Sequence, residues 1–284
     1  MIELLDLKID VVFKSFFGDK NSKEFLESFV NSVLGLEGKH AIQVETLSFP
    51  SYDRTPFPEV SLTTTKGDCY IIKMQAHIHE GFDRKLLYHL VKNYTECIDL
   101  YPSAPISTFH MINIFDDYRF EEKSLLNGTH YLETYSLEPE SGFSDKHLFD
   151  QWKVTILDLK KFGNRSLNEL KTTNEKWLHL LKNAPCIIQE EANNLKKEPI
   201  FKHALKRLED LSLDPSKQKA YKKSLSALRD YLSILASERA AGYEEGCQEE
   251  RLDIAQSLSS QGVSPQQVCD ATGVSMEEID AIRG

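Results

Sequence analysis

Four polar residues in the first third of the chain have types and spacing that suit metal-assisted chemistry on a phosphodiester. Lys73 and Gln75 lie two positions apart in an alternating segment, so both side chains point to the same side of a strand. Glu59 lies in the preceding alternating segment, and Asp10 lies near the start of an amphipathic one. Metal-assisted phosphodiester cleavage can use acidic groups that converge from a helix and two neighbouring strands to hold Mg²⁺, beside a polar residue that orients water.

The elements that must position these residues are predicted from hydrophobic periodicity. In the first part of the chain, the pattern predicts helices over 8–17, 22–34 and 82–100, and strands over 41–49, 57–65, 69–78, 106–115, 128–136 and 152–158. Lys66-Gly67-Asp68 is a hairpin turn between two of these strands. Farther on, the pattern predicts only helices, over 166–182, 198–211, 217–240, 250–260, 265–272 and 276–283. The order helix, three strands, helix, strand fits the αβββαβ core of restriction-endonuclease-like nucleases.

Short motifs in this order resemble those of the transposase-associated PD-(D/E)XK nucleases, also called recombination-promoting nucleases. The family opens with an Asp-Val-x-Phe-Lys-x-x-Phe-Gly pattern, matched here by Asp10, Val11, Phe13, Lys14, Phe17 and Gly18. An acidic residue before Val follows on the second strand, here Glu59, and then Glu-Met-Gln on the third, here Lys73-Met74-Gln75. The helix from Phe82, which bears Arg84, Tyr88 and Tyr94, and the Glu/Gly/Gln-rich segment with short terminal helices are also similar to the family.

The resemblance implies an α/β fold with a mixed sheet and an all-helical C-terminal extension. It also implies a metal-dependent DNA endonuclease or transposase, with Mg²⁺ or Mn²⁺ as cofactor if active and DNA as partner. Asp10 and Glu59 would be the metal ligands, and Gln75 would match the glutamine that replaces the more common lysine. We expect a nuclease-like core over 1–165, a helical region over 166–240 and an acidic helical tail over 241–284.

Lys73 departs from the family pattern, because it replaces the Glu of Glu-Met-Gln. The change of two charge units disfavours a divalent cation, so we expect cleavage to be impaired or absent, with no cofactor if the site is dead. Three interpretations of Lys73 are open. It is a cation in place of the metal, paired with Glu59 and Asp10; it is a migrated catalytic lysine; or the strand register differs from the predicted one.

Several neighbouring residues have both a functional and a plain interpretation. His77 and His79 share the parity of Lys73, so His77 is a candidate replacement ligand, although two surface histidines at a strand end are the commoner case. Arg84 and Lys85 are candidate DNA contacts, or simply partners of Glu80 and Asp83. Asp10 near a helix start is stabilised by the helix dipole whatever its chemistry. The sequence has no glycine-rich phosphate loop, GxSxG or HExxH motif, which excludes the commonest rival enzymes.

Charge and composition bound the remaining possibilities. The net charge of −10 is concentrated in the tail, where residues 237–284 hold ten acidic side chains and three arginines, whereas residues 195–224 hold nine basic and four acidic ones. Five scattered cysteines without CxxC spacing indicate reduced thiols in a cytoplasmic protein. No apolar run is long enough for a membrane span.

An alternative function is that of a catalytically dead interaction protein that acts through its helical C-terminal half. Leu225, Leu228, Leu232 and Leu235 form a heptad-like stripe, which is more often a core face than a coiled coil. The last helix is acidic, and phosphate would repel it. The terminal helices therefore favour self-association over DNA reading, and we expect a homo-oligomer.

Overall fold

The computed structural model describes residues 3–48, 59–75, 82–100, 108–116, 130–136 and 152–283. The chain forms two compact units, Met1–Ser224 and Leu225–Gly284, which are treated separately below. Across the described residues, no helix is both long enough and apolar enough to cross a membrane.

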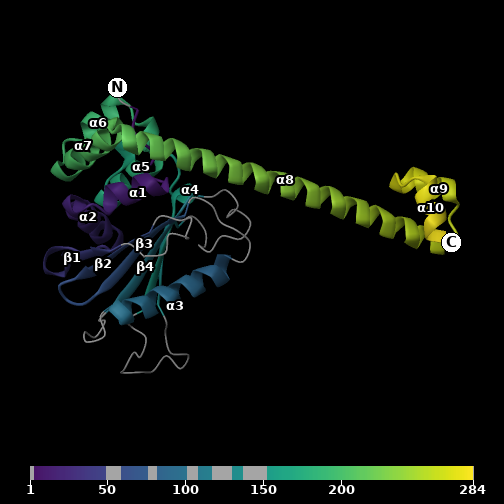
Figure 1. Cartoon of the computed structure of the whole chain (residues 1–284), viewed down its shortest axis with the longest axis horizontal. Coiled ribbons are helices and arrows are strands. Elements are labelled where there is room, and N and C mark those ends of the chain that lie inside the picture. The colour runs from purple at the N-terminus through teal and green to yellow at the C-terminus, as the bar shows by residue number, and fades with distance from the viewer. Residues whose placement is uncertain are drawn as a thin grey trace. The chain divides into compact units, whose positions relative to one another are not determined.

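A six-stranded mixed sheet is the centre of the first unit (Figure 1). Its strands are β1 (Val44–Ser48), β2 (Glu59–Thr64), β3 (Cys69–Gln75), β4 (Phe109–Phe115), β5 (Leu132–Ser136) and β6 (Trp152–Asp158). The spatial order is β1-β2-β3-β4-β6-β5, with parallel pairing of β3 with β4 and of β4 with β6, and antiparallel pairing elsewhere. The mixed sheet and the αβββαβ order of the core are as predicted.

Helices make up most of the remaining described residues. The first unit holds α1 (Asp10–Phe17), α2 (Lys23–Leu34), α3 (Phe82–Leu100), α4 (Leu159–Phe162), α5 (Thr173–Asn183), α6 (Gln189–Leu195) and α7 (Pro199–Leu213). Short 3-10 turns are η1 (Lys20–Ser22), η2 (Gly38–His40), η4 (Leu167–Glu169) and η5 (Ala184–Cys186). Helix α8 (Pro215–Ser260) begins in the first unit and continues into the second, which also holds α9 (Pro265–Thr272) and α10 (Met276–Arg283).

All seven residues of β3 and all seven of β4 are buried, so both faces of the central sheet are covered. Because strand residues alternate between faces, the odd-numbered ones share one face. That face packs against α3, where the buried cluster consists of Cys69, Ile71, Leu90, Cys97, Phe109 and Met111. Parallel strands inside a sheet are covered on both faces, which is why β3 and β4 are both apolar and buried.

A helical layer of α1, α2, α5 and α7 is held together by aromatic rings. Trp177 is fully buried and contacts the rings of Phe16, Phe17, Phe29 and Phe201. Phenylalanines at helical spacing in α1 and α2 form one side of this cluster, and residues of α5 and α7 form the other. Residues far apart in the sequence therefore close one core.

The structure corrects several of the predicted helices. Residues 217–240 and 250–260 were expected as separate helices, but both lie within the continuous helix α8. The predicted helix over 166–182 is instead the turn η4 followed by α5. Helices α4 and α6 were not predicted, because both are shorter than the three turns that give a clear period.

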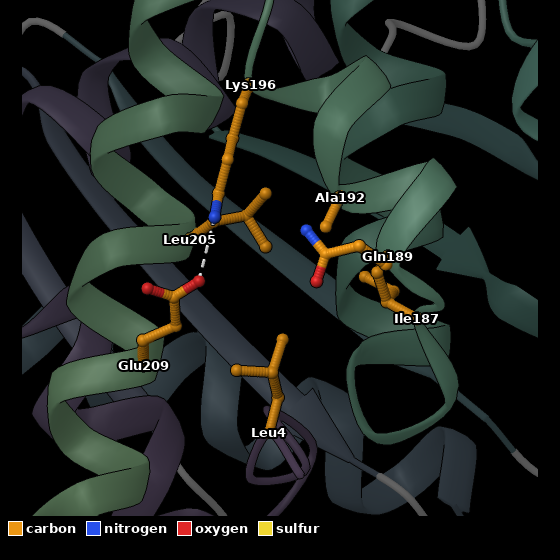
Figure 2. A pocket seen from close by; sticks show the side chains of 7 residues that line it. All are labelled: Leu4, Ile187, Gln189, Ala192, Lys196, Leu205 and Glu209. Carbon is orange, nitrogen blue, oxygen red and sulfur yellow. Dashed lines mark hydrogen bonds and ion pairs between the residues drawn. The ribbon is translucent and has the colours of Figure 1, made fainter. Parts of the chain in front are cut away.

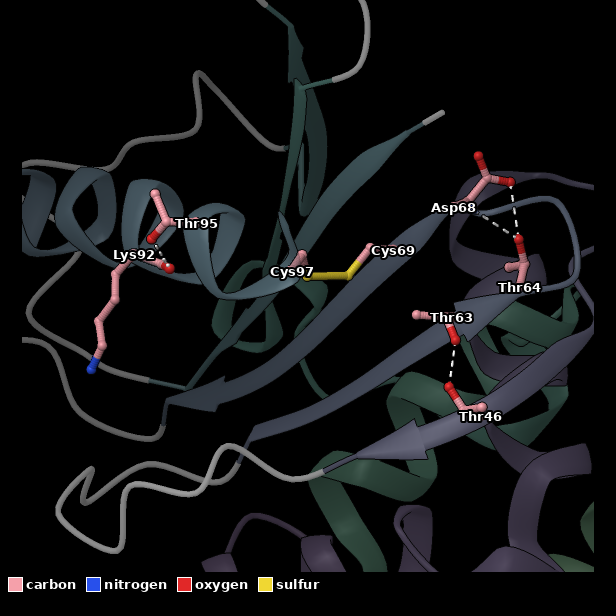
Figure 3. Close-up of a disulfide and its surroundings, with 8 residues drawn as sticks. All are labelled: Thr46, Thr63, Thr64, Asp68, Cys69, Lys92, Thr95 and Cys97. Atoms are coloured by element: carbon pink, nitrogen blue, oxygen red, sulfur yellow. Dashed lines mark hydrogen bonds between the residues drawn. A yellow bond between two sulfur atoms is a disulfide. The ribbon is translucent and has the colours of Figure 1, made fainter. Parts of the chain in front are cut away.

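The prediction of five reduced cysteines is wrong for one pair. Cys69 of β3 and Cys97 of α3 form a disulfide, which joins the helix to the sheet (Figure 3). The 28-residue separation gave no spacing signal, and the two residues meet only because α3 folds back along β3. Cys186, Cys247 and Cys269 are free thiols.

In the second unit, the end of α8 packs with α9 and α10 around a small apolar cluster of Ala255, Val268, Val274 and Ile279. Gly262 follows the end of α8 and Gly273 is the C-cap of α9, and their φ values of 82° and 74° lie in the left-handed region that favours glycine. Ser275 and Glu278 form a reciprocal capping box at the start of α10.

Candidate functional site

A buried polar row crosses the central sheet at three neighbouring strands. Glu59 of β2 lies opposite Lys73 of β3, and Lys73 lies beside Asn113 of β4. The Lys73 Nζ atom is 3.5 Å from a carboxylate oxygen of Glu59. The exposed fractions of Glu59, Lys73 and Asn113 are 4, 2 and 1%. We call these three residues the polar row.

The polar row points toward α3. Residues directly paired across strands project to the same face, and Lys73 and Asn113 have the parity of Ile71 and Met111, which pack against α3. Three α3 residues bear electrostatically on Lys73 or Glu59, namely Lys85, Lys92 and Glu96. The site therefore lies between the sheet and α3, and most of its charged neighbours are basic.

Burial opposes ionisation in both members of the Glu59–Lys73 pair. It raises the pKa of Glu59, which the Lys73 ammonium opposes, and lowers the pKa of Lys73, which the Glu59 carboxylate opposes. Lys85 and Lys92 lower the pKa of Lys73 further. Desolvation, with help from Lys73, also lowers the pKa of His89 on α3 to about 4, so its imidazole is neutral near pH 7. Each charge of the pair thus depends on the other.

Asn113 is a member of the site that the sequence patterns did not single out. Its amide nitrogen and its amide oxygen are both buried and have no hydrogen-bond partner among the described residues. Buried polar groups are nearly always hydrogen-bonded, so an orphaned amide indicates a group in need of a partner. The signal was present, because Asn113 and His110 are the two polar residues in the otherwise apolar strand FHMINIF.

Asp10 and Gln75 are placed differently with respect to the polar row. Asp10 is the first residue of α1, and its carboxylate is 2.9 Å from the ammonium of Lys14 in the same helix. Gln75 is buried at the end of β3 and shares the face of Lys73, two residues away. The structure thus brings Glu59, Lys73 and Gln75 to one face, while Asp10 has its ion pair within α1.

The remaining candidates lie toward the start of α3 or beyond the described residues. Arg84 is exposed and Lys85 is half-buried. His77 and His79 fall outside the described residues, so the replacement-ligand prediction is not addressed.

The described residues do not fit a divalent metal ion. Among them, no three His, Cys, Asp or Glu side chains come together as a ligand set. Glu59 contributes a single carboxylate, and the nearest group to it across the hairpin is an ammonium. A hard divalent cation prefers several oxygen ligands and no adjacent positive charge. The site is therefore built as an ion pair.

A separate hollow of about 400 Å³ lies among α6, α7 and the start of the chain (Figure 2). It is lined by Leu4, Ile187, Gln189, Ala192, Lys196, Leu205 and Glu209. Its two charged side chains, Lys196 and Glu209, pair with each other at 2.9 Å. None of the residues lining the hollow belongs to the polar row, and its two charges pair with each other, so we do not include it in the site.

Comparison with protein families finds a match to the model of the PD-(D/E)XK nuclease family transposases, over residues 7–238. No curated protein and no solved structure matches the chain. The matched range contains the whole sheet, the polar row and most of the helices, and its αβββαβ core is the one described above. The chain belongs to the PD-(D/E)XK nuclease family transposases.

Proposed function

We propose that the core binds DNA and that its Glu59–Lys73 ion pair takes the place of the catalytic metal, so that Mg²⁺-dependent cleavage is impaired or lost. The observation that supports this proposal is the buried 3.5 Å contact between the two side chains. One unit-charge repulsion at 4 Å is worth roughly 4 kcal/mol at an effective dielectric of about 20. A cation approaching Glu59 meets that repulsion from Lys73.

PD-(D/E)XK nucleases generally use divalent metals, and the family membership suggests DNA as the substrate. In this chain the basic residues on α3 are the natural contacts for a phosphate backbone. Arg84 is exposed near the start of α3, and Lys85 and Lys92 lie farther along the same helix. Phosphate contacts of this kind give affinity and position but no sequence preference.

Restoring the missing carboxylate is the most direct test of the metal-replacement proposal. Lys73→Glu would place two carboxylates in register on β2 and β3. We expect Mn²⁺ to raise the melting temperature of this variant and to switch on nicking of supercoiled plasmid. Lys66→Glu makes the same charge change in the exposed hairpin turn and serves as the control, with neither effect expected.

The native protein supplies the opposing outcome. Nicking by the native chain that requires Mg²⁺ or Mn²⁺ and disappears in Glu59→Ala would contradict the proposal and favour Lys73 as a migrated catalytic lysine. A Lys73→Glu variant that folds but neither binds Mn²⁺ nor nicks DNA would also contradict it. The thermal shift separates lost metal binding from lost catalysis.

A second candidate function is that of an interaction protein that acts through the helical C-terminal half. Helix α8 favours it, because none of its residues from Leu225 to Arg251 is buried. Fluorescence anisotropy with labelled duplex DNA distinguishes the two candidates. DNA binding that weakens steeply as the salt concentration rises supports the DNA-binding core. No DNA binding even at low salt, about 50 mM, supports the interaction protein.

A further inference from the structure

Helix α8 carries an apolar seam in the part of the helix that belongs to the second unit. The seam consists of Leu225, Leu228, Leu232 and Leu235, whose 3-4-3 spacing keeps them on one side of a helix. All four are half-buried, and every residue from Leu225 to Arg251 is half-buried or exposed. An isolated helix gains most of its stability from packing of an apolar face, so this seam requires a partner.

The charge along α8 indicates the identity and direction of that partner. The segment before the seam holds Lys217, Lys219, Lys222 and Lys223 and no acidic residue. The segment after it, residues 236–245, holds three glutamates and one arginine. A second copy in the parallel direction would put lysines beside lysines, whereas an antiparallel copy puts lysines beside glutamates.

We propose that two copies of this chain associate through an antiparallel coiled coil of α8. Leu225 of one copy packs beside Leu235 of the partner subunit, and Leu228 packs beside Leu232 of the partner subunit. In the same alignment the lysine-bearing segment before the seam of each copy runs beside the glutamate-bearing segment after the seam of the partner subunit. The apolar layers and the direction of the charge along α8 therefore favour the same antiparallel arrangement.

The seam is short, and the residues on either side of it mark where it ends. After Leu235 the same heptad positions are occupied by Arg239 and Gly242, which cannot continue an apolar seam. Before Leu225 the preceding heptad position of the seam is occupied by Tyr221, and the helix begins at Pro215. The contact is therefore centred on residue 230, and it does not depend on whether the core cuts DNA.

Analytical ultracentrifugation of the full-length protein is the first test. We expect a dimer that Leu228→Glu weakens about 100-fold, because each dimer loses two buried leucines worth about tenfold each. Ala227→Glu introduces the same residue one position away, on an exposed side of the helix, and we expect it to leave the dimer unchanged. Circular dichroism of both variants checks that α8 remains helical.

Disulfide trapping determines the direction. In a chain with Cys186, Cys247 and Cys269 replaced by serine, we expect Leu225→Cys with Leu235→Cys to form a cross-linked dimer joined between these two positions. Leu228→Cys alone should not cross-link to itself. Raising the salt concentration should weaken the dimer, because the flanking charges attract each other.

Three outcomes would overturn the proposal. These are a monomer at every concentration, a dimer that Leu228→Glu does not weaken, and a Leu228→Cys variant that cross-links to itself and forms a stronger dimer in high salt. The last result would indicate a parallel coiled coil.

Discussion

At the scale of single residues, the Glu59–Lys73 pair is costly to keep and costly to break. Two charges removed from water lose several kcal/mol of hydration each, and their attraction repays this only when both are present. Burial raises the pKa of Glu59 and lowers the pKa of Lys73, and both shifts favour the neutral form of the group. Such a pair adds little net stability, so its role at the site explains its presence better than its contribution to stability does.

Removing one partner should therefore destabilise the fold more than removing both. We expect Lys73→Met to lower the free energy of unfolding by about 3–5 kcal/mol, because Glu59 is left buried beside no cation. Glu59→Met together with Lys73→Met should recover most of that loss. Urea denaturation followed by circular dichroism measures both. A double variant as unstable as the single one would show that the ion pair itself is net stabilising.

His110 supplies a pH dependence whose sign can be worked out. Burial, with a contribution from Lys153, lowers the pKa of His110 to about 4 from an ordinary 6.5. Between these values the unfolded chain binds a proton that the folded protein excludes, so stability falls as the pH drops from 6.5 to 4. The full loss is about 3 kcal/mol, because each pKa unit is worth 1.36 kcal/mol.

The variant His110→Gln should remove that part of the acid sensitivity. We expect the difference in unfolding free energy between pH 7 and pH 4 to be smaller by about 3 kcal/mol in this variant than in the native protein. His40→Gln, at an exposed position, is the control and should change nothing. Equal acid sensitivity in all three proteins would show that His110 does not titrate as its burial indicates.

The pairing of Glu59 with Lys73 was accessible from the sequence, whereas the rest of the site was not. Alternation in two strands joined by the Lys66–Asp68 turn fixes which residues oppose each other. The ion pair of Asp10 with Lys14 is local to α1, but the position of Asp10 relative to the polar row depends on how α1 packs on the sheet, which is tertiary information. Asn113 lies in a strand added by a crossover helix, and only the register between parallel strands places it beside Lys73.

At the scale of elements, the largest error concerned α8, which was expected to end at residue 240. Gly242 and Gly246 follow that position, and glycine is unfavourable in a helix interior. Glycine costs only about 1 kcal/mol in a helix interior, and the alanines and glutamates around both glycines are strong helix formers. The summed propensity of the segment outweighs two unfavourable residues, so the helix continues to Ser260.

Ser264 with Gln267 and Ser275 with Glu278 both have the spacing of a capping box, but only the second pair forms one, which gives a matched pair of variants. The Ser275 hydroxyl accepts from the Glu278 backbone N–H, while the Glu278 side chain accepts from the Ser275 backbone. The Ser264 hydroxyl instead donates to the Gln267 side chain and caps no backbone group. We expect Ser275→Ala to cost about 1 kcal/mol in the second unit and Ser264→Ala clearly less.

Hydrogen exchange of the amides in α9 and α10 measures that difference without requiring a separate melting transition for the second unit. The expected sign is faster exchange in Ser275→Ala than in Ser264→Ala. Equal exchange rates in the two variants would mean that the capping box does not limit the opening of α10.

At the scale of the whole molecule, charge and structure divide the chain at nearly the same place. Residues 225–284 carry seven of the ten net negative charges and form the second compact unit. The first unit holds the polar row and the basic residues of α3, and the start of α8 is tied to it by Lys217, whose ammonium donates to the Ser15 hydroxyl at 2.9 Å. Ending the chain after Ser224 therefore preserves that tie while removing the acidic segment.

A chain that ends at Ser224 should keep the melting temperature of the core to within about 2 °C and should be monomeric. We expect it to bind duplex DNA more tightly than the full-length protein at low ionic strength, because the long-range repulsion of phosphate by the acidic segment is removed. Screening shortens that repulsion to about 10 Å at 0.1 M salt, so the difference should shrink as salt increases. Fluorescence anisotropy titrations at two salt concentrations measure it. Weaker binding of the shortened chain at both concentrations would mean that α9 and α10 contact DNA despite their acidity.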